Sequence, residues 1–325
     1  MIDKVYIGID GGGTQTRALL TDRTGKVWGC GHAGSANRNH YPRESVRRTL
    51  SALFQETLSS LPANGHLAAI FLGMGGISTQ GDRQDFLQIV GEIPEISPSV
   101  QVIVENDTVV GLTGGLSGRP GLSLIAGTGS ACLGINPHGD RRLCGGWGAL
   151  ADDIGSASWI GLQALQAVVR AEDGRASPTH LQQIVFDFLG LSEPRELISR
   201  VHNTGLERAE LGQLAPRIAR ASEEGDAAAQ RILREAAAGL SEMVQVTAKK
   251  LFGDKDCELV LVGGLALSGA PFQPMLIERI QADCPQVRVC EPELSPVKGA
   301  VLEALRADGV AWTPDILANL RASSV

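Results

Sequence analysis

The sequence lacks a basic stripe, and its formal net charge is −7 with a pI near 5.4. Nucleic acids and anionic membrane surfaces are therefore poor candidates for its partners. It also lacks any apolar run that approaches the length of a membrane-spanning helix. Its first residues, MIDKVYIGID, contain no charged leader followed by a long apolar stretch, so we expect no signal peptide.

Disulfide and metal-binding patterns are also missing. The six cysteines are scattered without a Cys-x-x-Cys pair, and the six histidines never fall at the spacing of zinc ligands. Unpaired thiols are typical of a reducing cytoplasm, which is the location that we expect.

Two common nucleotide-binding motifs can be excluded. The sequence contains no G-x-x-x-x-G-K-[ST], so it has no P-loop. Residues Gly29–Gly34, GCGHAG, satisfy G-x-G-x-x-G, but a dinucleotide site needs a helix to begin within that motif. The SANRNHYP that follows has the composition of a loop, so we reject a Rossmann site here.

The 325 residues are 43% hydrophobic, and the 40 glycines gather at the ends of apolar runs. This length suits two domains with a sizeable core. The first half alternates strands and helices after antiparallel hairpins. We expect strands at Val5–Asp10, Ala18–Thr21 and Lys26–Gly29, a helix over 43–61, a strand in AAIFLGMGG, a short helix in DFLQIVGEI, and a strand ending near Glu105 that leads into a helix.

A second unit begins near residue 120 and repeats the opening arrangement of strand, glycine turn and strand. We then expect a helical region that includes 226–252, strands in CELVLVGG and VRVCEP, a final helix over about 297–307, and a loosely held tail after Val310. Two such halves predict a duplicated α/β architecture with a central cleft. The most linker-like stretch is GGLSGRP, residues 114–120.

The motif DGGGTQT follows the first expected strand. A hairpin turn is one explanation for it. A two-residue turn, however, needs neither three glycines nor two threonines, whereas successive glycines can aim several N–H groups at one anion. We predict a hydrated Mg²⁺ at Asp10 and a phosphate site formed by Gly11, Gly12, Gly13, Thr14 and Thr16.

Two further glycine motifs lie in the second half. AGTGS again allows a tight hairpin, but a second turn of this kind could clamp a triphosphate together with the first. VGG follows a strand and precedes an expected helix, where its glycines either allow close packing or leave bare backbone for a nucleotide's sugar and base. The candidate nucleotide-binding residues here are Gly127, Thr128, Gly129, Ser130, Gly263 and Gly264.

The segment ENDTVVGL places Asn106 and Asp107 where a strand gives way to a helix. Both residue types are favoured helix N-caps, which is one reading. In the other, Asp107 accepts a proton from a substrate hydroxyl, because phosphoryl transfer needs positioning, charge neutralisation and one carboxylate. An aspartate with an ordinary low pKa can serve, since it takes the proton late.

The segment CGGWGALADDIGSASWIG is the least generic in the chain. Trp147 stands among glycines without helical or strand periodicity, which is not typical of a core residue. Asp152 and Asp153 precede a helix, where one of them could complement the helix dipole. A polyol also needs carboxylates and amides, and the SAN loop offers the amide of Asn37.

Taken in order, these motifs resemble the ASKHA superfamily, the actin-like and hexokinase-like ATP-binding fold. More narrowly they are similar to the N-acetylglucosamine kinase group of the BadF/BadG/BcrA/BcrD ATPase family, over roughly residues 4–305. The resemblance implies a two-domain, ribonuclease H-like fold of duplicated βββαβαβα units. Its domains would be 1–116, joined by the C-terminal helix at about 297–310, and 117–296.

The resemblance also implies roles for individual residues. Asp107 would be the general base for a sugar hydroxyl, O6, and Asp153 is preferred over Asp152 because it matches the family word D-[ED]-G-S. Ile154 replaces the acidic residue of that word, which puts the fine sugar preference in doubt. The substrate contacts would be Asn37, Asn106, Asp107, Gly145, Gly146, Trp147 and Asp153.

We therefore expect a homodimeric, ATP- and Mg²⁺-dependent kinase of N-acetylglucosamine. A glucosamine kinase, a broad-specificity hexokinase, and an ATPase that drives a partner protein stay open as alternatives. ROK-type sugar kinases usually carry a cysteine-rich zinc motif, which is missing here. Dehydratase-activating ATPases hold an iron–sulfur cluster, and Cys132 and Cys144 are not arranged for one.

Overall fold

The computed structural model describes residues 4–203 and 205–323. The chain divides into two compact units, unit 1 with Met1–Ser123 and Glu291–Val325, and unit 2 with Leu124–Cys290. The assignment of domains to 1–116 and 117–296 stays a prediction.

Unit 1 is built on a five-stranded sheet with the order β3-β2-β1-β4-β5. The three strands of the opening meander pair antiparallel, and β4 and β5 add in parallel to β1. Its elements are β1 (Lys4–Gly11), β2 (Gln15–Asp22), β3 (Val27–Gly34), α1 (Arg43–Leu58), β4 (His66–Met74), α2 (Gln80–Gly91), β5 (Gln101–Asn106), α3 (Asp107–Gly115), α11 (Pro296–Ala307) and α12 (Pro314–Ala322).

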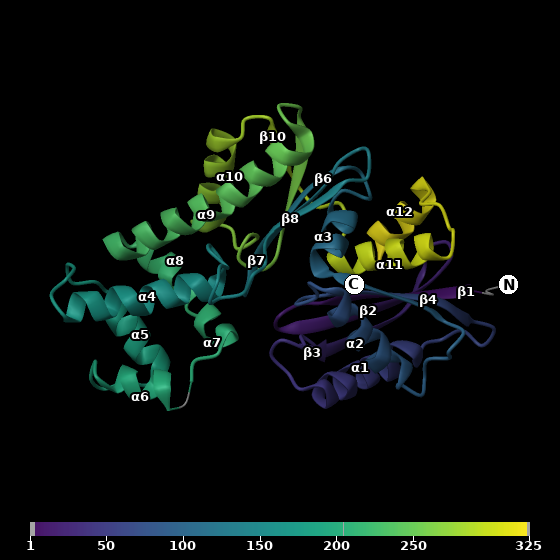
Figure 1. The fold of residues 1–325 in the computed structure, drawn as a ribbon, viewed down its shortest axis with the longest axis horizontal. Helices are drawn as coiled ribbons and strands as arrows, with labels where there is room; N and C mark the ends of the chain where they lie inside the picture. The colour runs from purple at the N-terminus through teal and green to yellow at the C-terminus, as the bar shows by residue number, and fades with distance from the viewer. Residues whose placement is uncertain (1–3, 204, 324–325) are drawn as a thin grey trace. The chain divides into compact units, whose positions relative to one another are not determined.

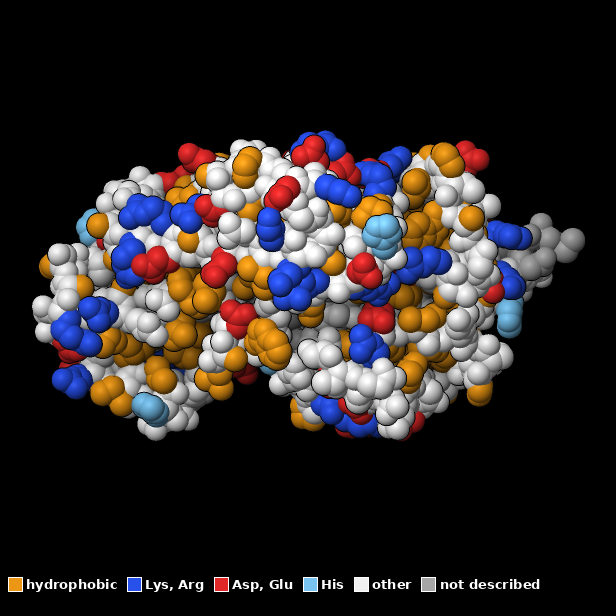
Figure 2. All heavy atoms as spheres, turned by 45° about the horizontal axis from the view of Figure 1, so that its top comes forward, with side chains coloured by type: hydrophobic (Ala, Val, Ile, Leu, Met, Phe, Trp, Pro, Cys, Tyr) orange, Lys and Arg blue, Asp and Glu red, His pale blue; other side chains and the backbone are white. Residues whose placement is uncertain are grey.

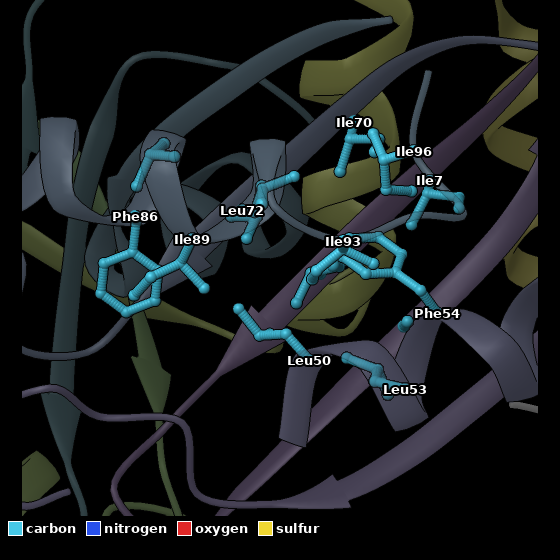
Figure 3. Close-up of a cluster of buried hydrophobic side chains, with 14 of the residues drawn as sticks. Ile7, Leu50, Leu53, Phe54, Ile70, Leu72, Phe86, Ile89, Ile93 and Ile96 are labelled. Carbon is cyan, nitrogen blue, oxygen red and sulfur yellow. The ribbon is translucent and has the colours of Figure 1, made fainter. Parts of the chain in front are cut away.

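Both faces of this sheet are covered, so β1 is apolar at almost every position. Because side chains alternate along a strand, Ile7 and Ile9 enter a core with Leu50 and Phe54 of α1, whereas Gly8 faces α11. Figure 3 shows this core, in which side chains from β1, β4, α1 and α2 converge. In Figure 1, α11 and α12 lie on the other face of the sheet.

The contact between β1 and α11 depends on Gly8. A Cβ atom at this position would lie 2.3 Å from the backbone nitrogen of Val301. Gly299 of the same helix is equally close to α3, since its Cβ would lie 2.2 Å from the carbonyl oxygen of Val110. These glycines let the backbones of β1, α11 and α3 approach one another within unit 1.

Unit 2 repeats the strand arrangement of unit 1. Its order, β10-β9-β6-β7-β8, is that of unit 1 when the strands are counted from β6, so the predicted duplicated α/β fold is confirmed. The elements are β6 (Gly121–Ala126), β7 (Ser130–Ile135), β8 (Arg141–Gly145), α4 (Ala157–Glu172), α5 (Leu181–Leu189), α6 (Glu196–His202), α7 (Arg208–Gly212), α8 (Ala215–Glu223), α9 (Ala227–Phe252), β9 (Cys257–Val262), α10 (Phe272–Asp283) and β10 (Val287–Cys290).

Two sequence predictions were wrong. The tail after Val310 is not loosely held, because α12 buries Ile316 and Leu320. No helix follows VGG directly: residues 263–271 form turns, and α10 begins only at Phe272. Gly269 has a left-handed φ of 75°, and Pro271 lacks the N–H that a continuing helix would use.

Charged side chains of both signs lie on the surface, as the sequence predicts with its similar numbers of acidic and basic residues. On the face drawn in Figure 2, basic and acidic side chains are interspersed. Across residues 4–203 and 205–323, no helix has the length and apolar character needed to cross a membrane.

We predict that Gly8→Ala destabilises the protein, because its methyl group would meet the backbone of α11 rather than a movable side chain. Overpacking of this kind costs roughly 1–3 kcal/mol. Urea denaturation should show this loss, while Gly34→Ala in β3, with no atom within 4 Å of the added Cβ, should keep the wild-type midpoint. Equal midpoints for Gly8→Ala and wild type would contradict the proposed packing.

Candidate functional site

The predicted catalytic residues of unit 1 lie at one edge of its sheet. β1, β4 and β5 are parallel, so their carboxyl ends meet at that edge. In this register Asp10 pairs with Gly73, and Met74 pairs with Asn106. Asp10 and Asp107 therefore stand on either side of the end of β4.

Gly75, in the turn after β4, leaves room for the carboxylate of Asp107. A Cβ at Gly75 would lie 3.2 Å from Oδ2 of Asp107 and 3.4 Å from the carbonyl oxygen of Gly11. The Gly75 N–H donates a hydrogen bond of 2.7 Å to that same oxygen, which fixes the turn to the end of β1. Sequence inspection gave Gly75 no role, since its importance comes from neighbours distant in the chain.

The two carboxylates have raised pKa values. Burial raises the pKa of Asp107 to about 7, and the negative charge of Asp10 adds to this effect. Burial also raises the pKa of Asp10 to about 6, against the opposing effect of Arg17. The pKa of Asp107 is therefore above that of an ordinary aspartate, which the sequence does not reveal because desolvation depends on the fold.

The DGGGTQT turn leaves backbone donors exposed. The Gly12 N–H donates to the carbonyl of Gln15 and closes the turn. Within the part of the chain that the structure describes, the N–H groups of Gly13 and Thr14 have no hydrogen-bond partner. Adjacent unpaired N–H groups fit the oxygens of a phosphate.

Thr16 does not share this open side of the turn. Its side chain is fully buried, and its hydroxyl donates a hydrogen bond of 2.9 Å to the carbonyl of Gly34. This bond connects β2 to β3. Thr16 is therefore not among the residues that we propose to bind phosphate.

Asn37 lies beside Asp107. Its Oδ1 accepts the N–H of Asn39, while its Nδ2 lies 3.5 Å from the point that a Cβ of Gly75 would occupy. No described residue accepts a hydrogen bond from this Nδ2. The carboxylate of Asp107 and the amide of Asn37 thus flank Gly75, with a donor and an acceptor available.

Asn106 is the N-cap of α3, which was one of the two roles considered for it. Its Oδ1 accepts hydrogen bonds from the N–H and hydroxyl of Thr108, and its Nδ2 donates to the carbonyl of Ile77. Asp107, the first residue of α3, is thereby left free of the capping role. The structure gives no support to a substrate contact by Asn106.

The AGTGS turn of unit 2, like the DGGGTQT turn, has backbone N–H groups that are available to a ligand. The N–H groups of Thr128 and Gly129 have no partner among the described residues. The turn is fixed from behind by α4, since the Ala157 N–H donates to Gly127 and the Ser158 hydroxyl donates to Thr128. A Cβ at Gly127 would meet nothing within 4 Å, so this backbone is open to a ligand.

The VGG motif adjoins this turn. Gly263 has a φ of 98°, and its Cβ would lie 2.5 Å from the carbonyl oxygen of Ala126. That oxygen also accepts the N–H groups of Leu265 and Ala266. Gly264 is open, with nothing within 4 Å of its Cβ position. The two glycine motifs of unit 2 are therefore neighbours in space.

The backbone conformation of the GGWG loop explains its glycines. Gly145, Gly146 and Gly148 all have left-handed φ values, of 82°, 75° and 88°, which other residues rarely adopt. They form a loop on which the side chain of Trp147 is 78% exposed. This exposure agrees with the view that Trp147 is not a core residue.

Asp153 is buried beneath the AGTGS turn. It has a left-handed φ of 59°, is 2% exposed, and accepts an N–H bond of 3.4 Å from Ser130. It also pairs with Arg208 of α7. Burial raises the pKa of Asp153, and Arg208 opposes that rise. Arg208 has no motif around it, so no sequence pattern indicated this partner.

The predicted site residues therefore form one group in each unit. Unit 1 brings together Asp10, the open turn, Asn37 and Asp107, and unit 2 brings together AGTGS, VGG and Asp153. Among the residues that the structure describes, no three His, Cys, Asp or Glu side chains gather as metal ligands. A Mg²⁺ ion at Asp10 would keep most of its water ligands, as this ion commonly does.

Asp10→Asn should lower the pKa of Asp107, because it removes a negative charge that now opposes ionisation. The measurement is an NMR pH titration of the labelled aspartate carboxyl carbons, with Asp107→Asn identifying the signal. Asp315→Asn, a change at the exposed start of α12, is the control and should leave the titration near 7. An unchanged titration in Asp10→Asn would show that the two carboxylates do not interact.

Comparisons with known proteins agree with this geometry. The chain is 31% identical to an N-acetylmuramic acid/N-acetylglucosamine kinase of Clostridium acetobutylicum, over 93% of this chain and 98% of the relative. It is 28% identical to an N-acetyl-D-glucosamine kinase of Dictyostelium discoideum, over 94% of this chain and 99% of the relative.

A solved structure from Chromobacterium violaceum, provisionally named an N-acetylglucosamine kinase, matches with a TM-score of 0.71 and 28% identity, over 92% of this chain and 98% of that one. The expected actin-like fold is thereby confirmed. The profile of the BadF/BadG/BcrA/BcrD ATPase family matches residues 7–304. The chain therefore belongs to the BadF/BadG/BcrA/BcrD ATPase family, whose members use ATP.

Proposed function

We propose that the protein is a Mg²⁺-dependent kinase that transfers the γ-phosphoryl group of ATP to O6 of an amino sugar, N-acetylglucosamine. The observation that carries the proposal is that Asp107 and an open glycine turn both follow strand ends at the same edge of the sheet. The relatives named as kinases of N-acetylglucosamine support the substrate class. A cytoplasmic location and a homodimer stay predictions.

Asp107 is the base of this reaction. It begins α3 but leaves the capping to Asn106, so its carboxylate can accept a proton from the sugar hydroxyl. Its pKa of about 7 makes it a stronger base than an ordinary aspartate while a large fraction stays ionised near neutral pH. The proton moves to Oδ of Asp107 as the sugar oxygen bonds to the γ-phosphorus, while the bond from that phosphorus to the bridging oxygen breaks and ADP leaves.

Asn37 and Asp107 orient the sugar. The two side chains flank Gly75, where Nδ2 of Asn37 offers a hydrogen-bond donor and the carboxylate of Asp107 offers an acceptor. Two neighbouring hydroxyls of the sugar can therefore bind one to each side chain. Placing the reacting hydroxyl against its base accounts for a large part of catalysis in phosphoryl transfer. We assign the remaining sugar contacts to Gly145, Gly146, Trp147 and Asp153 as predictions from the resemblance.

The nucleotide is bound by backbone groups in this proposal. In unit 1 the N–H groups of Gly13 and Thr14 would bind phosphate oxygens. In unit 2 the N–H groups of Thr128 and Gly129 offer a second set of phosphate donors. Gly264 leaves open backbone for the adenosine, and Gly263 allows the tight backbone contact with Ala126 beside it. When bound, ATP supplies the transferred group, and Mg²⁺, held through water by Asp10, neutralises phosphate charge.

A panel of sugars tests the function. ADP release should be measured with N-acetylglucosamine, glucosamine, N-acetylmannosamine and glucose, and we expect the first to be the best substrate. Asp107→Asn should lower kcat roughly 10²–10⁴-fold, the usual contribution of a positioned base. It should keep wild-type affinity for ATP, measured by calorimetry, because Asp107 does not form the phosphate turn.

The exposed Asp315→Asn variant is the control for the loss of a carboxylate and should retain full activity. Preference for glucosamine or glucose would favour the alternative sugar kinases. ATP hydrolysis that no sugar stimulates would sink the kinase proposal and favour an ATPase that acts on a partner protein.

Gly75→Ala should impair turnover without unfolding the protein. The added Cβ would lie 3.2 Å from Oδ2 of Asp107, close enough to move that carboxylate by a few tenths of an ångström. Small displacements of a positioned base cost up to roughly 10²-fold in rate. The control is Gly91→Ala, which meets nothing within 4 Å. Wild-type kcat in Gly75→Ala would argue against Asp107 as the base.

A further inference from the structure

Arg17 of β2 is the residue directly opposite Asp10 in the antiparallel pair of β1 and β2. Directly opposed residues in such a pair place their side chains on the same face of the sheet, with Cβ atoms about 4.5–5.5 Å apart. Arg17 is therefore on the Asp10 face, and only three residues separate it from the glycines of the phosphate turn.

The guanidinium of Arg17 has no hydrogen-bond or ion-pair partner in residues 4–203 and 205–323. Arg17 is exposed, and no described residue forms a hydrogen bond or an ion pair with it. Other arginines of unit 1 are engaged, as Arg38 and Arg43 are with Asp85, and Arg83 is with Glu105. Its position beside the turn is thus not explained by a contribution to folding.

The charge around the turn calls for a cation. Asp10 and Asp107 both carry negative charge when ionised, and a nucleotide's phosphate chain would add more. The turn itself offers only the partial charges of its N–H groups. Among the described residues, Arg17 is the cation whose charge acts on Asp10. A positive side chain therefore lies on the face of the sheet where an anion would approach Asp10.

We propose that Arg17 binds the phosphate chain of the nucleotide, as a phosphate-binding residue contributed by the strand that follows the glycine turn. The inference rests on the proposed function, since it adds a side chain to the same site. Its planar fork can donate two hydrogen bonds to one phosphate group, whereas lysine would supply a point charge only. Arg17 would also stabilise the charge that develops during transfer.

Nucleotide binding tests this role separately from turnover. Calorimetry should compare ATP with adenosine, which lacks phosphates, for the wild type, Arg17→Gln and Arg17→Lys. We expect Arg17→Gln to weaken ATP binding roughly 10–100-fold, the range for a hydrogen bond to a charged group. Adenosine should bind equally to all three proteins, and Arg17→Lys should fall between the other two for ATP.

The matched control is Arg48→Gln. Arg48 is likewise exposed and without an ion pair among the described residues, but it lies on α1, which covers the opposite face of the sheet. It should bind ATP as the wild type does. Melting curves for both glutamine variants should coincide with that of the wild type, because neither arginine supports the fold.

Two results would overturn the inference. Unchanged ATP affinity in Arg17→Gln would show that Arg17 does not reach the phosphates. Equal losses for ATP and adenosine would show that the substitution acts through the fold. If the wild type binds ATP but phosphorylates no sugar, the proposed function fails, while the comparison of ATP with adenosine still decides the role of Arg17.

Discussion

The parallel alignment of β1, β4 and β5 is the constraint on which the site in unit 1 depends. It brings three strand ends to one edge, and the register then fixes Asp10 and Asp107 on either side of β4. Burial at this edge raises the pKa of both carboxylates, and the negative charge of Asp10 adds to the rise at Asp107. The fold holds this unfavourable arrangement in place, as is common where charges serve chemistry.

Glycine has different physical purposes at different places in this chain. Gly8 and Gly299 have no side chain, so helices can touch backbone there, and Gly75 leaves room for the carboxylate of Asp107. Gly145 and Gly263 instead adopt left-handed φ values. Close backbone contacts and tight turns therefore account for many of the glycines, and the phosphate motif is only one of the places where they occur.

Sequence patterns predicted the strands, most helices and the duplicated fold, because apolar periodicity and glycine turns are local signals. They also identified Asp10, Asp107 and the two open turns as candidates. They could not tell that the hydroxyl of Thr16 is used inside the sheet, or that Asn106 caps α3, since both depend on the direction of one side chain. Gly75 and Arg208 lacked a motif, and α12 is a helix of only nine residues, with two buried side chains to signal it.

The packing of α11 on β1 has a consequence for how the protein is made. Gly8 leaves the ribosome early, but the helix that covers it is synthesised only after all of unit 2. Unit 1 therefore cannot be completed before unit 2 has been synthesised, unlike a chain whose N-terminal domain is complete first. Unit 2, which is continuous in the chain, can collapse during translation, while the apolar face of β1 must wait. During that interval the nascent chain exposes a surface that chaperones commonly bind.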